Sequence, residues 1–473
     1  MSSIVSAQVR NGHAPVKTVV RANLKKHVSE RRRIASLADD PPRGASSYSL
    51  TTGRSGDHYP VFELLSSIFN APSPGEFQAQ LEEPWYEPSD RLLLKDGARI
   101  VSHLRLYHRD MRLGSHWLPV AGITELATRQ EYRGQGCATA LIAAAERQMR
   151  EDGTVLGLVR TTSPELFLRA GWSYCGRHCY SETGTREILA QLSATESSRV
   201  AAASPSPHDS RPAPLSTRIW RHVERAALER LYLQNTRHAC GPIQRSDEYW
   251  RWLISRRAYD TIYVAVEGPD KLDLDETPIV GYAVTKGDRI VEIMGDARLP
   301  AARTQLVARI CGDAIERDVH SIRLDAPPND PLHRLFVAAG GQHRWREIDS
   351  GQALMAKLLD PLDFLSQLLP QIFDRAKNAG LTLPTELGLQ IGEMKLRLVV
   401  TRRSAKVERG KLGRSYITCG LQDLTPLFVG HLDAKALPPD GPWQCSTRTA
   451  AELANVLFPR LPLWRPPLDE ISA

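Results

Sequence analysis

The sequence predicts an α/β protein in which mixed sheets are flanked by helices and more than one domain is present. The chain has 473 residues, of which 42% are hydrophobic. This length corresponds to about three domains of ordinary size and allows more than one packed core. Two kinds of segment alternate along the chain. One has the alternating apolar pattern of strands, and the other has the longer apolar period of helices. The composition excludes a fully disordered or fibrous protein.

Breaks in composition divide the chain. Residues 1–44 contain nine Lys and Arg against three Asp and Glu, and thus carry nearly all of the net charge of +7. We expect this segment to be a disordered, solvated basic tail. Residues 194–216 are dominated by Ala, Ser and Pro, which is typical of a flexible linker. A further boundary near Asp360 leaves three predicted folded units, at 45–193, 217–355 and 361–473.

The charge distribution and hydropathy limit the partners. Outside the tail the charges balance, which argues against a nucleic-acid-binding core. The tail could contact polyanions through its basic runs, but a solvated arm is the favoured interpretation. No apolar stretch approaches the ~18 residues of a membrane-spanning helix, and residues 1–50 lack the apolar core of a secretory signal. We therefore expect a soluble, cytoplasmic protein without membrane contact.

The seven cysteines predict neither a disulfide framework nor a metal site. They are odd in number and include no Cys-x-x-Cys pair. Cys175, His178 and Cys179 lie close together in the sequence, but no second ligand cluster accompanies them. We expect reduced thiols and assign no metal.

The first unit has a regular succession of elements. Its periodicities predict a helix at 61–69, a hairpin of strands at 91–95 and 99–108, a strand at 122–128, a helix at 137–151, a strand at 155–160, and a short helix after Ser163 that ends at Gly171.

The turn between the strand at 122–128 and the next helix predicts an anion site. It reads Arg133-Gly134-Gln135-Gly136-Cys137-Ala138-Thr139. The first N–H groups of the helix lack partners and lie at the positive end of its dipole. Small residues let a diphosphate approach the main chain, and the Thr139 hydroxyl can add a donor. The turn is not a Walker loop, and Thr139 stands where a dinucleotide motif requires Gly or Ala, so a dinucleotide fold is the weaker interpretation.

These residues resemble the signature of the GNAT acetyltransferase superfamily, Arg/Gln-x-x-Gly-x-Gly/Ala, at every fixed position. The segment Leu166–Trp172 looks like the FYxxxGF box of the same superfamily. The resemblance implies acetyl-CoA as co-substrate, with residues 133–139 around the diphosphate. It also implies that the thioester lies beside the preceding strand, with backbone contacts from Leu126, Ala127 and Thr128.

The wider order of elements resembles the enhanced intracellular survival (Eis) group, which has two tandem GNAT folds followed by a sterol-carrier-like α+β domain. In the second unit the corresponding turn, Asp296–Pro300, has no glycine and contains a proline. We therefore expect a degenerate copy that does not bind CoA. In the third unit, alternating residues at 387–391 and 396–400 predict half-buried strands, and residues 415–430 resemble the strand-to-helix step of sterol-carrier folds. Apolar side chains here are interpreted as core rather than as a lipid pocket.

The catalytic groups are less well defined by the sequence. In the Eis group a tyrosine of the FYxxxGF box protonates the leaving thiolate, and Phe167 occupies that position here. Either the thiolate leaves without this acid, with help from Tyr174 or a neighbouring hydroxyl, or the domain binds CoA without transfer. Tyr174 is equally well explained as a core residue. Glu125 is a candidate base, and Ala473 is the position of the terminal carboxylate that serves the Eis group, although a loose tail is the favoured interpretation after Arg465.

Three classes of function follow. The first is an acetyl-CoA-dependent N-acetyltransferase acting on a primary amine of a small molecule or a protein lysine. The second is a non-catalytic acyl-CoA- or lipid-binding protein, and the third is a nucleic-acid-associated protein that uses the tail. The amine is not identified, and a homo-oligomer is left open.

Overall fold

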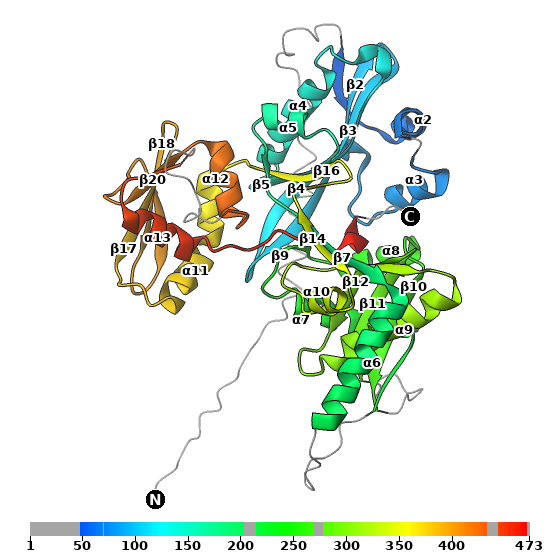
Figure 1. Cartoon of the computed structure of the whole chain (residues 1–473). Helices are drawn as coiled ribbons and strands as arrows, with labels where there is room; N and C mark the ends of the chain where they lie inside the picture. Colours follow the sequence, from blue (N-terminus) through cyan, green and yellow to red (C-terminus); the bar gives the residue numbers. More distant parts are fainter. Residues whose placement is uncertain (1–47, 70, 203–213, 269–277, 433–442, 471–473) are drawn as a thin grey trace, which may run out of the picture.

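The structure is a computed structural model that describes residues 48–69, 71–202, 214–268, 278–432 and 443–470. Within these ranges the strands form three sheets, each accompanied by its own helices (Figure 1). The predicted α/β class with mixed sheets is confirmed. The basic tail at 1–44 and residues 203–213 of the predicted linker lie outside the described residues.

The first sheet has the strand order β1-β2-β3-β4-β5-β16-β15, with β6 paired to β16 and β9 paired to β3. Its strands are β1 (Ser49–Thr52), β2 (Arg91–Asp96), β3 (Arg99–Leu113), β4 (His116–Thr128), β5 (Leu156–Thr161), β6 (Ser173–Tyr174), β9 (Cys240–Ile243), β15 (Ile348–Asp349) and β16 (Gln352–Leu358). Leu92 and Leu94 pack under α4 (Cys137–Glu151) and α5 (Pro164–Arg169). Leu93, on the opposite face, packs under α2 (His58–Phe69) and α3 (Pro74–Leu81). The period-2 alternation therefore gives both faces of this sheet a core.

The second sheet has the order β14-β7-β13-β12-β11-β10-β8. Its strands are β7 (His178–Gly184), β8 (Leu215–Ile219), β10 (Thr261–Glu267), β11 (Ile279–Lys286), β12 (Arg289–Gly295), β13 (Ser321–Asp325) and β14 (Gln342–Arg346). Three helices share a core on one face, namely α6 (Thr185–Ala202), α9 (Ala301–Glu316) and α10 (Leu332–Ala338). The other face is covered by α7 (Arg225–Asn235) and α8 (Asp247–Ser255).

The two sheets exchange a strand. After β6 the chain leaves the first sheet, and β7 pairs with β13 and β14 in the second. After β14 the chain returns, and β16 pairs with β5 and β6 in the first. The units therefore cross over at residues 175–177 and 347, which corrects the predicted boundaries at 193 and 355. A strand's apolar alternation shows which side is buried but not which sheet it joins.

The predicted linker at 194–216 is also corrected. Helix α6 extends to Ala202, and β8 begins at Leu215. Ala and Ser are compatible with a helix, and the first proline of this segment is Pro205, beyond the last helical residue Ala202.

The third sheet has the order β19-β18-β17-β20-β21. Its elements are β17 (Thr385–Ile391), β18 (Met394–Val400), β19 (Ala405–Arg409), β20 (Tyr416–Cys419), β21 (Gln444–Cys445), α11 (Pro361–Asn378), α12 (Leu421–Phe428) and α13 (Arg448–Leu457). The predicted strands at 387–391 and 396–400 and the strand-to-helix step at 415–430 are confirmed. The likeness to sterol-carrier domains stays a prediction.

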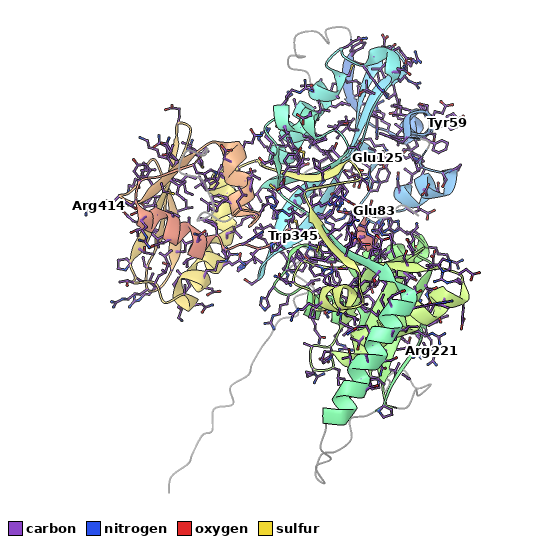
Figure 2. All side chains as sticks on the ribbon, viewed as in Figure 1. Tyr59, Glu83, Glu125, Arg221, Trp345 and Arg414 are labelled. Carbon is purple, nitrogen blue, oxygen red and sulfur yellow. The ribbon has the colours of Figure 1, made fainter. Side chains whose placement is uncertain are left out.

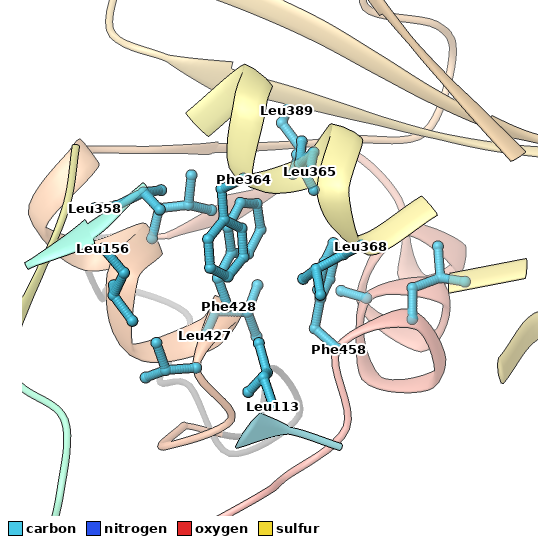
Figure 3. Close-up of a cluster of buried hydrophobic side chains, with 14 of the residues drawn as sticks. Leu113, Leu156, Leu358, Phe364, Leu365, Leu368, Leu389, Leu427, Phe428 and Phe458 are labelled. Carbon is cyan, nitrogen blue, oxygen red and sulfur yellow. The ribbon is translucent and has the colours of Figure 1, made fainter. Parts of the chain in front are cut away.

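The third unit shares its core with the first. Leu113, Leu156 and Leu358 of the first sheet belong to the same buried cluster as Phe364 and Phe428 (Figure 3). The Phe428 ring stacks on Phe364 at a centroid distance of 5.4 Å and on Phe458 at 4.6 Å. Side chains thus fill the space between α11, α12 and the first sheet, as the core interpretation expected. Among the described residues, no helix is long and apolar enough to cross a membrane.

Candidate active site

The turn between β4 and α4 presents open backbone donors. Gly134 and Gly136 have φ of 76° and 81°, the left-handed region that glycine adopts without strain. Helix α4 begins at Cys137, as predicted, and its N-cap Gly136 has no side chain to cap it. The first helical bond joins the Ala140 N–H to the Gly136 carbonyl at 2.9 Å. The N–H groups of residues 137–139 precede that bond and therefore point out of the helix end.

Side chains brace this turn without covering its glycines. The Tyr48 hydroxyl donates to Gln135 Oε1 at 2.6 Å, and Gln135 Nε2 donates to the Glu131 carbonyl at 3.0 Å. Arg133 Nε donates to the Thr128 carbonyl at 3.2 Å. A Cβ built on Gly134 or Gly136 would meet nothing within 4 Å. Thr139 is exposed one turn into the helix, and Ala138 is half-buried. The sequence-predicted residues 133–139 thus form one turn, here called the cradle, whose two glycines are exposed.

Strands β4 and β5 part beside this cradle. Their parallel register runs from Val120 opposite Leu156 to Ile123 opposite Val159 and then stops, although both strands continue. Glu125, two residues further along β4, has φ of 56°, which is strained for a residue with a side chain. The register of β4 against β3 shifts at the same place. A bulge therefore turns the end of β4 away from β5.

The predicted backbone contacts lie on this diverging end of β4. Ala127 is buried, and its carbonyl accepts from the Ser102 hydroxyl at 2.8 Å. Leu126 packs against the core under α4, and Thr128 is half-buried. Leu126, Ala127 and Thr128 therefore lie between the bulge and the cradle.

A buried polar cluster holds the bulge in place. The His103 Nδ1–H donates to the Glu125 carbonyl at 2.9 Å, and His103 Nε2 accepts from Arg91 at 3.0 Å. Burial, reinforced by the Arg91 charge, lowers the pKa of His103 to about 3, so the ring is neutral. The Glu125 carboxylate pairs with Arg91 at 2.7 Å and Arg105 at 3.8 Å. Burial would raise the pKa of Glu125, but these guanidinium groups outweigh it and hold the pKa below its ordinary value. Glu125 is consequently a stable carboxylate and a weak proton acceptor.

A cavity of about 290 Å³ opens where β4 and β5 part. Its walls come from α3, β3, β4, β5, α8 and the segment after α13. Figure 2 shows Glu83 and Glu125 close to this junction of the first and second units. The charged and aromatic lining residues are Glu76, Glu83, Glu125, Asp469, Glu470, Arg105, Arg109, Arg160, Arg256, Arg465, Tyr107, Tyr249 and Trp252.

The charges of the cavity wall largely neutralise one another. Glu83 pairs with both Arg105 and Arg109. Glu470 pairs with Arg160 at 2.5 Å and with Arg465 at 3.5 Å. Carboxylates and guanidinium groups are thus balanced, and the lining is not the strongly acidic surface that a polycation would require.

Arg256 bonds to the backbone, whereas the other cavity arginines pair with carboxylates. Its guanidinium donates to the carbonyl of Leu468 and lies 4.4 Å from the ring centroid of Trp252. Burial lowers the pKa of Arg256. It brings a positive charge and an aromatic surface together on one side of the cavity.

The segment after α13 completes the cavity. Leu463 forms bridges with Gly176 and Cys240, and the Trp464 N–H donates to the Cys240 carbonyl at 2.9 Å. Arg465 donates to the Tyr107 hydroxyl at 3.1 Å. The loose tail expected after Arg465 is therefore wrong as far as Glu470, because paired charges fix the segment. Ala473 lies outside the described residues.

The other two aromatic candidates are not cavity residues. Phe167 is buried, and its ring meets Trp172 edge-on at 5.4 Å within the core under α4. Tyr174 is half-buried on β6 opposite Met355 of β16. Burial, with Glu165 and Glu347, raises the pKa of Tyr174, which makes its proton harder to release. Neither residue lines the 290 Å³ cavity.

Sequence reasoning did not find the arginine and glutamate network. The available signal was in the predicted strand at 99–108, where His103, Arg105 and Tyr107 follow at every second position. Polar residues at that period place a polar face on one side of the strand, opposite Ile100, Leu104 and Leu106. Glu83, by contrast, lies in a turn with no motif around it, and only the fold brings it to Arg105.

In the second copy of the turn, an aspartate bonds to an arginine two residues later. The Asp296 carboxylate accepts from the Arg298 N–H at 2.9 Å and from the Arg298 guanidinium at 2.6 Å. Helix α9 starts after Pro300, and its Ala302 N–H donates to the Leu299 carbonyl at 3.0 Å. The absence of CoA binding by this copy stays a prediction.

Comparison with known proteins agrees with this geometry. Residues 50–175 match the acetyltransferase (GNAT) domain family. The matched residues contain the cradle, the bulge and Phe167. No match was found among curated proteins.

Solved structures resemble the chain over a greater length. A GCN5-related N-acetyltransferase from Anabaena variabilis has a TM-score of 0.66 and 19% identity over 88% of this chain and 99% of its own. One from Kribbella flavida has a TM-score of 0.65 and 15% identity over 88% and 97%. Eis1 from Mycobacterium abscessus has a TM-score of 0.58 and 15% identity over 88% and 98%. At these identities the likeness establishes the fold.

Proposed function

We propose that this protein is an acetyl-CoA-dependent N-acetyltransferase that acts by direct transfer on a primary amine of a small molecule or a protein lysine. The observation that carries the proposal is the open cradle at the start of α4, which adjoins the separation of β4 and β5 and the 290 Å³ cavity. GNAT domains use acetyl-CoA as co-substrate, and the match at 50–175 covers the cradle and the separation of β4 and β5.

In this proposal the turn and the strand end have separate tasks. The N–H groups of residues 134–139 hold the diphosphate, aided by the helix dipole and the Thr139 hydroxyl. The backbone of Leu126, Ala127 and Thr128 offers hydrogen bonds along the diverging strand end. This places the thioester beside Glu125, where β4 borders the cavity.

The amine approaches from the cavity. Its nitrogen forms the new bond to the thioester carbon, the carbon–sulfur bond breaks, and the amine proton passes to solvent or to a nearby acceptor. Because Arg91 and Arg105 stabilise its carboxylate, Glu125 serves mainly to attract and orient the amine. The rate is then expected to rise with pH while the amine is being deprotonated, with no plateau set by Glu125.

Calorimetry with CoA tests the cradle. Gly136→Val introduces a Cβ at a positive-φ site that faces open space, where the diphosphate would lie. We expect CoA affinity to fall at least about tenfold, because close backbone approach is lost. Gly153→Val is the matched control, since Gly153 has φ of 71°, has equal room for a Cβ and follows the same helix. Equal affinities of both variants would refute the assignment of the cradle.

One observation favours a second candidate, a CoA-binding protein without transfer. The position that provides the acid in the Eis group is Phe167, which is buried and has no proton to donate. A general acid contributes about 10²- to 10⁴-fold, so its absence should slow a transferase without abolishing it. Release of free thiol from acetyl-CoA with a panel of amines separates the two. No amine-dependent release in wild type or in Phe167→Tyr, with CoA still bound, would establish the second function.

Tyr174→Phe tests whether Tyr174 donates the proton to the leaving thiolate. Because Tyr174 is outside the cavity lining and its pKa is raised, we expect less than a threefold change in rate. Loss of most activity, with CoA affinity unchanged, would assign the proton donor to Tyr174.

A further inference from the structure

A cysteine and two histidines meet on one face of the exchanged strand. Cys179 and Ser181 lie on β7, two residues apart, and therefore point to the same side. His343 of β14 stands directly opposite Ser181 in the antiparallel register. Helix α10 packs on both strands and brings His333 to the same place.

The distances suit a shared cation. One potential ligand atom from each of Cys179, His333 and His343 lies within 4.8 Å of the other two. Cys179 Sγ and His333 Nε2 are 3.5 Å apart. A tetrahedral Zn²⁺ with Zn–S of about 2.3 Å and Zn–N of about 2.0 Å separates sulfur and nitrogen by roughly 3.5 Å. This pair has the required spacing, and the ligand atom of His343 lies within 4.8 Å of both.

Ser181 orients both imidazole rings. Its Oγ is 2.8 Å from His333 Nδ1 and 3.1 Å from His343 Nδ1. A ring whose Nδ1 is hydrogen-bonded keeps Nε2 for a metal, and His333 Nε2 is the atom near Cys179 Sγ. His333 Nε2 is also 3.1 Å from the Pro327 carbonyl, so a bound ion would replace that hydrogen bond.

The surroundings give the site one open side. Cys179 and His333 are buried, whereas His343 is exposed. An ion can therefore enter past His343 and be held by buried ligands, with a water in the remaining position. None of the three residues lines the 290 Å³ cavity.

We propose that Cys179, His333 and His343 bind one thiophilic divalent cation of the Zn²⁺ type, which clamps the exchanged strand β7 to β14 and α10. Binding releases the thiol proton of Cys179 and leaves the Nδ1–H tautomer of each histidine. This site differs from the cysteine cluster considered in the sequence, because Cys175 is buried in the core of the first unit and His178 bonds to Arg160 and Gln352. The proposal is independent of acetyl transfer.

Cobalt substitution of the full chain tests the site. Metal-free protein titrated with Co²⁺ should take up one equivalent and develop both a thiolate-to-cobalt charge-transfer band and the intense visible bands of tetrahedral Co²⁺. Cys179→Ser should abolish the charge-transfer band, and His343→Gln should weaken Co²⁺ affinity at least about a hundredfold. Ser181→Ala, which removes only the orienting hydroxyl, should weaken affinity about ten- to a hundredfold.

Two matched controls remove the same chemical groups elsewhere. Cys445→Ser removes an exposed thiol, and His222→Gln removes an exposed imidazole. Both should bind Co²⁺ as the wild type does, and Zn²⁺ should raise the melting temperature of wild type but not of His343→Gln. His343 is exposed, so its variant keeps the test valid even if Cys179→Ser misfolds. A wild type without the charge-transfer band, or a band that survives in both Cys179→Ser and His343→Gln, would overturn the proposal.

Discussion

The first and second sheets follow the same strand order, β1-β2-β3-β4-β5 in one and β8-β10-β11-β12-β13 in the other, with a helix after β4 and after β12. In the first copy that helix begins behind two positive-φ glycines and leaves its N–H groups open. In the second copy the buried Asp296 carboxylate in the turn accepts from the Arg298 N–H and guanidinium. The same architecture thus has two glycines in one turn and a carboxylate with its arginine partner in the other.

A second comparison concerns what each sheet gives to the other. The first half of the chain supplies β7 to the second sheet, and the second half supplies β16 to the first. In both cases the donated strand pairs with the strand that follows the long helix, β13 or β5. Each sheet therefore contains a strand from the other half of the chain, and the two copies are not simply joined end to end.

The largest effect is expected when the chain is cut between the two halves that exchange strands. A chain with a protease site inserted between residues 203 and 213, cleaved after folding, should elute as one species of full mass. Because β7 and β16 each lie within the opposite sheet, separation requires unfolding. Gel filtration in buffer and in denaturant checks this. Two halves that separate in buffer and stay folded would contradict the exchange.

The next largest effect is the loss of stability expected when Arg245 is replaced. Its fully buried guanidinium pairs with Glu292 of β12 at 2.5 Å and with Asp469 at 2.9 Å. Arg245→Met leaves two buried carboxylates unpaired, which should cost about 3–5 kcal/mol in the free energy of unfolding. Chemical denaturation measures this. Arg298→Met, which removes an arginine that is 85% exposed, is the control and should cost no more than about 1 kcal/mol.

The smallest effect tests the charge of Asp296 in the second copy of the turn. Hydrogen bonds from the Arg298 side chain and backbone lower the pKa of Asp296 from its ordinary 3.8 to about 2. A lowered folded-state pKa contributes stability that is present above the ordinary value and is lost as pH falls toward about 2. Asp296→Asn should therefore destabilise by on the order of 1 kcal/mol near neutral pH, since Arg298 is exposed and its attraction is screened.

The measurement is the unfolding free energy of wild type and Asp296→Asn between pH 2 and pH 6. The two curves should converge at the acid end. Asp288→Asn changes an exposed carboxyl in the turn before β12 and serves as the control. A difference that stays constant down to pH 2 would show that Asp296 acts through packing and not through its charge.

Much of the fold could be predicted because it is encoded locally. Helix α4 begins and ends where its apolar period and flanking glycines predicted, at Cys137 and Glu151. The strands at 387–391 and 396–400 followed from alternation. The strand exchange could not be predicted, since β7 and β16 have the same local pattern whichever sheet they join.

The candidate site likewise has one part that the sequence predicted and one part that it could not predict. The cradle at 133–139 is contiguous, so its residue types alone indicate backbone donors and room for an anion. The cavity wall and the proposed metal site are assembled from distant segments. Glu83 meets Arg105, and Cys179 meets a histidine 154 residues further along the chain, only after the sheets have formed. Single-sequence patterns contain no signal for such pairs.

The position of the segment Leu463–Glu470 has a consequence for the order of events during synthesis. A ribosome releases the cradle and the bulge hundreds of residues before it releases Arg465 and Asp469, which bond to Tyr107 and Arg245. A nascent chain that has already folded its first helices therefore has an unfinished cavity. The cavity can therefore be completed only after residues 463–470 have left the ribosome, whatever the earlier segments have already formed.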